Sequence, residues 1–135
     1  MQAIRWILYF FAALFVVTAI FVVLPWSTFN AFVGWFGPYA YPDEPLIQYS
    51  IKAMLALFFW IGVLMFVVVA RPEKYPTILL VFVWLFLSFA VIALGLGWTY
   101  GVPWFFYIDA VSSAVIGALF LAYRAQAAKG EASEG

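Results

Sequence analysis

Four stretches of this chain are each long and apolar enough to cross a lipid bilayer as a helix. About 20 apolar residues in a helix span the hydrocarbon core of a membrane. Backbone polar groups that lipid surrounds must be satisfied inside the segment itself, so spans of this kind are helical. The predicted spans cover residues 4–24, 47–70, 76–97 and 104–124. The expected fold class is therefore all-α: a polytopic membrane protein whose four transmembrane helices form an up-down bundle.

The composition supports a membrane protein and narrows the chemistry. Of the 135 residues, 69% are hydrophobic and 9% are charged, whereas a soluble domain has roughly 45–50% and 25%. The chain has no histidine and no cysteine, so the usual side-chain ligands for haem, iron–sulfur clusters, zinc and copper are missing. We predict no metal site, no cofactor and no catalytic residue, and an enzyme is the less expected class. Zero net charge without a basic run argues against a nucleic-acid partner.

The segments outside the spans predict two further features. Phe29, Phe32 and Phe36 recur at helical spacing in the first loop, which indicates a short interfacial helix over about residues 28–36. Residues 1–124 then form the transmembrane domain. The polar residues 125–135 are expected to be a disordered cytoplasmic tail.

The distribution of basic residues predicts the orientation in the membrane. An even number of spans places both termini on one side, and five of the six basic residues fall on that side. The positive-inside rule puts this side in the cytoplasm, which predicts a multi-pass protein of the cell's inner (plasma) membrane. Tyr123 is expected to mark the same membrane interface as a headgroup anchor. The five basic residues are Arg5, Arg71, Lys74, Arg124 and Lys129.

Two charged residues, Lys52 and Asp109, lie clearly within predicted spans and away from their last residues, where charges are costly and are functional candidates. Both lie about two turns or less from the outer end of their spans, at nearly the same depth. One interpretation is that the two residues form a structural charge pair, and another is that they belong to a ligand pocket. Alternatively, Lys52 snorkels to the lipid headgroups, and Asp109 is protonated and hydrogen-bonded to a neighbouring helix. Nearby polar and aromatic residues are candidates to line such a pocket: Gln48, Tyr49, Tyr100, Tyr107, Ser112 and Ser113.

A stripe of small residues runs along the fourth predicted span. Ala110, Ala114 and Gly117 belong to it, and small residues let membrane helices approach closely. We interpret the stripe as a helix-packing surface inside the bundle, with a subunit interface as the alternative.

The layout resembles that of the DoxX-like and BphX-like small four-helix bacterial membrane proteins over about residues 4–124. The residues that carry the resemblance are Gly34-Trp35-Phe36-Gly37-Pro38, after the first span, and Val69-Ala70-Arg71-Pro72, at the end of the second. A Gly-rich end of the third span and a polar entry to the fourth complete it. The resemblance implies a helical bundle and an accessory membrane subunit, associated in some members with quinone-linked oxidoreductases. It supplies no catalytic motif to transfer.

Two functional hypotheses follow, with a third that the sequence favours less. The first is a non-enzymatic accessory or scaffolding subunit of a larger membrane complex, whose partners are the lipid bilayer and other membrane subunits or further copies of itself. The alternative is a binder or carrier of a small amphiphile, a quinone or a lipid, in an outward-facing pocket near Lys52 and Asp109. The third, a homo-oligomeric channel or transporter, is favoured less because one four-helix unit has little room for a pore. The first span contains no acidic residue, which argues against a small multidrug transporter.

Overall fold

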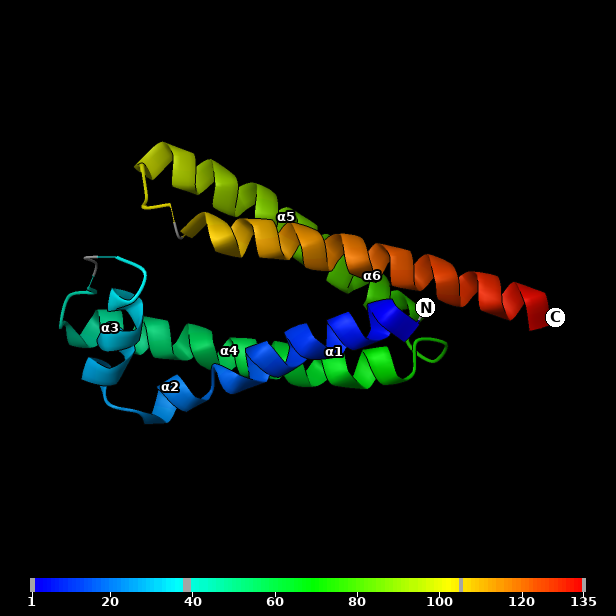
Figure 1. Cartoon of the computed structure of the whole chain (residues 1–135), viewed down its shortest axis with the longest axis horizontal. Helices are drawn as coiled ribbons and strands as arrows, with labels where there is room; N and C mark the ends of the chain where they lie inside the picture. The colour runs from blue at the N-terminus through cyan, green and yellow to red at the C-terminus, as the bar shows by residue number, and fades with distance from the viewer. Residues whose placement is uncertain (1, 38–39, 105, 135) are drawn as a thin grey trace. The chain divides into compact units, whose positions relative to one another are not determined.

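A computed structural model describes residues 2–37, 40–104 and 106–134. Six helices follow one another along the chain (Figure 1): α1 (Gln2–Val17), α2 (Ile20–Val23), α3 (Trp26–Gly34), α4 (Pro45–Ala70), α5 (Pro76–Tyr100) and α6 (Phe106–Glu134). Met1, Pro38, Phe105 and Gly135 belong to predicted segments or motifs but lie outside the described residues.

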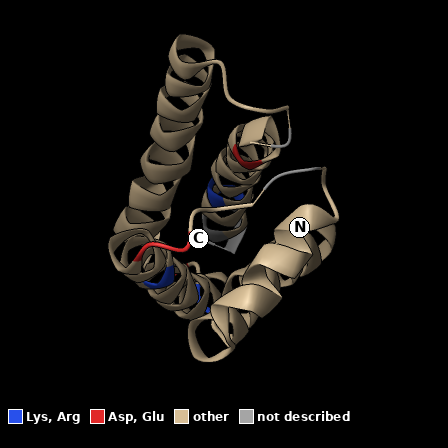
Figure 2. Ribbon diagram, turned by 90° about the vertical axis from the view of Figure 1, so that its left-hand side faces the viewer, with Lys and Arg blue, Asp and Glu red and all other residues tan. Residues whose placement is uncertain are grey.

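The predicted fold class is confirmed: in its described parts the chain is all-helical, with four apolar segments that can each cross a membrane. These segments are Gln2–Val23, Pro45–Ala70, Pro76–Tyr100 and Phe106–Gly130. At 1.5 Å per residue, the 26 residues of α4 measure about 39 Å, which is more than the hydrocarbon core requires. Figure 2 shows that charged residues occupy few positions along the helices.

The chain divides into two compact units. Unit 1 consists of residues 1–9 and 67–135, which include α5 and α6, and unit 2 consists of residues 10–66. In unit 1, α5 and α6 pack side by side as an antiparallel hairpin (Figure 1). Three stacked rings hold this hairpin together: Phe120 lies 5.2 Å from Phe82 and 6.0 Å from Phe86, between ring centroids. Phe120 is fully buried.

Two side chains of unit 1 bind the last carbonyl groups of α4. The final carbonyls of a helix have no partner within the helix. The Arg5 guanidinium donates a hydrogen bond to the carbonyl oxygen of Ala70 (2.7 Å), and the Tyr123 hydroxyl donates to that of Val69 (2.7 Å). These bonds tie α1 and α6 to the end of α4. Tyr123 is fully buried, so its prediction as a headgroup anchor is wrong.

In unit 2, α1 and α4 approach closely at Gly62. A Cβ atom built on Gly62 would lie 2.8 Å from the carbonyl oxygen of Ala12 and 2.9 Å from Phe15 Cβ and from Val16 Cγ2. One turn away, Phe15 packs edge-on against Phe58, with 5.6 Å between ring centroids. The absent side chain of Gly62 therefore brings the two helices into backbone contact.

The first predicted span is continuous, but the structure divides it into α1 and α2 at Thr18-Ala19. The Thr18 hydroxyl donates to the carbonyl oxygen of Phe15 (2.6 Å) and lies 3.4 Å from that of Leu55 on α4. The N–H groups of Ala19 and Phe21 bond three residues back instead of four, as in a 3₁₀ turn. A threonine side chain that competes for backbone acceptors commonly disturbs a helix in this way.

The short helix predicted over residues 28–36 is present as α3, shifted to Trp26–Gly34. Pro25 ends the preceding segment and opens α3. The Asn30 amide fixes the chain that returns toward α4: it donates to the carbonyl oxygen of Tyr41 (3.2 Å) and accepts from the Tyr41 N–H (3.0 Å). The ring of Tyr41 stacks on Phe29, with 5.8 Å between centroids.

The end of the chain differs from its prediction. α6 continues to Glu134 and so includes residues 125–134 of the segment 125–135 that we expected to be disordered. Alanine is the strongest helix former, and Ala125, Ala127 and Ala128 extend the helix beyond the apolar span.

Candidate ligand pocket

Asp109 lines an open pocket of about 270 Å³ between α5 and α6 in unit 1. Its side chain is exposed and lies in the first turn of α6, which begins at Phe106. The N-terminal turn of a helix stabilises a carboxylate through the helix dipole. The other lining residues are mostly apolar: Phe89, Ala93, Leu96, Gly97, Tyr100, Val102 and Phe106.

The wall that α5 contributes is a stripe on one helix face. Its residues are spaced four, three, one and three apart along the chain, which is the spacing of one face of a helix. This periodicity is visible in the sequence, but α5 is apolar nearly all round, so periodicity could not single out this face. We call these residues the α5 stripe: Phe89, Ala93, Leu96, Gly97 and Tyr100.

The turn that closes the pocket depends on glycine. Gly101 ends α5 in the left-handed conformation, with φ +61°, which glycine adopts without steric cost. The N–H groups of Gly101 and Val102 both bond to the carbonyl oxygen of Gly97, the latter at 3.2 Å. The Gly101 bond is that of an αL cap, and the Val102 bond is the longer one found in a Schellman motif. This turn directs the chain back toward α6 and places Val102 in the pocket wall.

The remaining predicted pocket residues of α6 have different positions. The Tyr107 ring packs on Gly97, where an added Cβ would lie 3.1 Å from Tyr107 Cε1. Ser112 is half-buried and Ser113 is buried. None of the three lines the pocket. Of the predicted residues, the structure thus brings Asp109 and Tyr100 together here.

Lys52 and its predicted neighbours belong to unit 2. Lys52 Nζ donates to the carbonyl oxygen of Leu24 (3.5 Å), at the C-terminal end of α2, where a cation stabilises unpaired carbonyls. Gln48 Nε2 bonds to Asp43 Oδ1 just before α4, and Tyr49 is exposed. Because Lys52 and Asp109 lie in different units, their charge pair stays a prediction.

The small residues of α6 are buried to different degrees. Gly117 is buried, and a Cβ added to it would lie 2.8 Å from Leu87 Cγ and Cδ2 on α5. Ala110 is buried as well, and Ala114 is half-buried. Gly117 therefore packs against α5, and Ala110 is enclosed by protein.

The fold and its pocket define a small multi-pass helical membrane protein. Comparisons with known proteins find no family model, curated protein or solved structure that matches the chain. Among the described residues, no three His, Cys, Asp or Glu side chains gather in a way that could hold a metal ion.

Proposed function

We propose that this protein binds a small amphiphile, a quinone or a lipid, in the pocket between α5 and α6. The observation that carries the proposal is the Asp109 carboxyl group in the lining of a mostly apolar pocket, within a membrane span. Ionisable residues in spans are costly and usually mark a binding or transport path. A volume of about 270 Å³ lies near the lower limit for small-molecule sites, so it suits a headgroup and the start of its tail.

The polar and the apolar residues of the lining would divide the recognition between them. Asp109 and the Tyr100 hydroxyl offer hydrogen bonds to a polar head. The apolar part of the α5 stripe, Phe89, Ala93 and Leu96, offers a surface for a hydrocarbon tail. This arrangement fits a ligand that enters sideways from the bilayer.

The test is a binding titration on the full chain in detergent, with decylubiquinone and a lysophospholipid as the two probes. Tryptophan quenching reports the quinone, and native mass spectrometry reports the lipid. We expect Asp109→Asn to weaken binding of at least one probe by about tenfold, because a charge-assisted hydrogen bond is lost. Ala93→Leu fills the pocket and is expected to weaken the same probe comparably.

Matched controls make the result specific. Glu73→Gln removes an exposed acid in the loop before α5, and Ala118→Leu enlarges an exposed alanine of α6 outside the pocket. Both controls should bind as the unmodified chain does. Equal affinity of all four variants for both probes would refute the pocket assignment. The Lys52→Met variant tests the predicted charge pair separately.

A second candidate function is an accessory subunit of a larger membrane complex. Two observations support it: the four spans account for most of the chain, and only residues 71–75 join α4 to α5. Few residues therefore remain outside the membrane to form a soluble catalytic site. The DoxX-like resemblance points the same way. Migration as an isolated monomer, after mild extraction from native membranes, would contradict this candidate.

The proposed location is the cell's inner (plasma) membrane, with both termini in the cytoplasm. The five flanking basic residues support this orientation. Because the chain has no cysteine, single cysteines at the exposed positions Ser27 and Ala132 can be labelled without interference. A membrane-impermeant maleimide should label Ser27→Cys in intact cells and leave Ala132→Cys unlabelled; the reverse pattern would overturn the orientation.

A further inference from the structure

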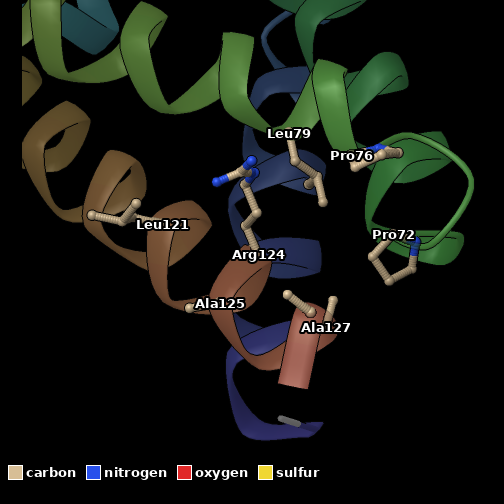
Figure 3. A pocket seen from close by; sticks show the side chains of 8 residues that line it. Pro72, Pro76, Leu79, Leu121, Arg124, Ala125 and Ala127 are labelled. Atoms are coloured by element: carbon tan, nitrogen blue, oxygen red, sulfur yellow. The ribbon is translucent and has the colours of Figure 1, made fainter. Parts of the chain in front are cut away.

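A second pocket lies at the other end of the α5–α6 hairpin, where α5 begins. Its volume is about 180 Å³, and Figure 3 shows the side chains that line it. Apart from one arginine, all of them are apolar: Pro72, Pro76, Leu79, Leu121, Arg124, Ala125, Ala127 and Ala128. It shares no residue with the Asp109 pocket.

Arg124 is the charged group of this second pocket. Figure 3 shows its side chain extending from α6 toward Leu79 on α5. Arg124 Nε is buried and makes no hydrogen bond to any residue that the structure describes. A buried polar donor without a partner is costly. An acceptor beside Nε would remove this cost, and an anion is the best acceptor because the guanidinium is positively charged.

The start of α5 favours an anion at the same place. The first N–H groups of a helix have no partner within the helix, and the helix dipole makes this end electropositive. Pro76 and Leu79 bring the first turn of the 25-residue α5 into the pocket lining. Pro76 has no N–H group, and the Leu79 N–H already bonds to the carbonyl oxygen of Tyr75 (3.1 Å). The first turn of α5 would therefore favour an anion through the helix dipole alone, and Arg124 would supply the hydrogen bonds.

The position and the walls of the pocket indicate what carries this anion. Pro76 begins a membrane span, so the first turn of α5 lies at the level of the lipid headgroups. Leu79 and Leu121 continue the lining toward the middle of their spans, along the path of an acyl chain. Three further basic residues of unit 1, Arg5, Arg71 and Lys74, belong to the same end of the spans.

We propose that Arg124 binds the phosphate group of an anionic phospholipid beside the electropositive first turn of α5. Guanidinium groups match phosphate geometry through paired hydrogen bonds. The site is separate from the amphiphile pocket, so either proposal can fail without the other.

The test measures retained lipid on the delipidated full chain in detergent by native mass spectrometry. The probes are phosphatidylglycerol, phosphatidylcholine and inorganic phosphate, each added alone. We expect one phosphatidylglycerol to bind at least about tenfold more tightly than phosphatidylcholine. Arg124→Gln should remove that preference by weakening phosphatidylglycerol binding about tenfold.

Two variants separate a specific site from general electrostatic attraction. Lys129→Gln removes the same charge further along α6, at an exposed position outside the pocket, and should change binding less than twofold. Arg124→Lys keeps the charge but loses the paired geometry, so it should bind with intermediate affinity. Equal losses in Arg124→Gln and Lys129→Gln would overturn the proposal, as would unchanged binding in Arg124→Gln. Displacement of the lipid by inorganic phosphate at equal concentration would assign the site to the free ion instead.

Discussion

Replacing Gly62 with leucine is expected to lower the free energy of unfolding by about 3 kcal/mol, the largest effect of any substitution considered for this chain. The Cβ atom alone would lie 2.8 Å from a backbone carbonyl oxygen of α1, that of Ala12. A backbone atom cannot rotate away as a side chain can, so α1 and α4 must separate. Reversible unfolding in mixed micelles of detergent and SDS measures the change.

Gly95→Leu provides the matched control, because Gly95 lies in the apolar span α5 and an added Cβ meets nothing within 4 Å. There the substitution should be neutral or stabilising, since leucine is a better helix former than glycine by about 0.5–1 kcal/mol. Gly62→Ala should lie between the two, with a loss of about 1–2 kcal/mol. Equal stability of the two leucine variants would show that α1 and α4 do not meet at Gly62.

The Tyr123→Phe variant is expected to lose about 1–2 kcal/mol of stability. It removes one oxygen atom and leaves the carbonyl of Val69 without the bond that the Tyr123 hydroxyl donates (2.7 Å). Tyr123 is fully buried, so water cannot replace the hydroxyl in the structure as it stands. The same unfolding measurement gives the loss.

Tyr49→Phe is the control for this second substitution. Tyr49 is 72% exposed, so loss of its hydroxyl should change stability by no more than about 0.5 kcal/mol. Arg5→Gln should reduce stability in the same direction as Tyr123→Phe, because Arg5 bonds the adjacent carbonyl of Ala70. A Tyr123→Phe variant as stable as Tyr49→Phe would mean that the carbonyl of Val69 does not need this partner.

Local features of the sequence predicted the helices well and their interruptions less well. Length and apolarity were sufficient for the four spans, although α4 begins at Pro45, two residues before the predicted start at residue 47. The break at Thr18 was missed because it depends on a hydroxyl that bonds within α1 and lies near Leu55, 37 residues away. The extension of α6 beyond residue 124 was not predicted, because the polar residues of this segment indicated disorder. The helix propensity of its alanines favours a helix instead.

The candidate site was predictable in part. Asp109 was predicted because few charged residues lie within the spans. Tyr100 was predicted because it lies near the loop that joins the third and fourth spans. The apolar wall of the pocket could not be identified from the sequence, because lipid-facing and pocket-facing residues of a span are equally apolar. Tyr123 shows the same difficulty: an aromatic residue near the end of a span is typical of both a headgroup anchor and a buried hydrogen-bond donor.

The sequence by itself determined that this is a helical membrane protein with four spans, because the hydrophobic thickness of the bilayer and the backbone's need for hydrogen bonds leave no other solution for such apolar segments. Only the tertiary structure decided which faces of those helices meet. In lipid, all faces of an apolar helix are nearly equivalent in solvation, so contacts are chosen by shape and by single polar groups. Gly62 against Ala12, Phe120 among Phe82 and Phe86, and Tyr123 on Val69 are such contacts.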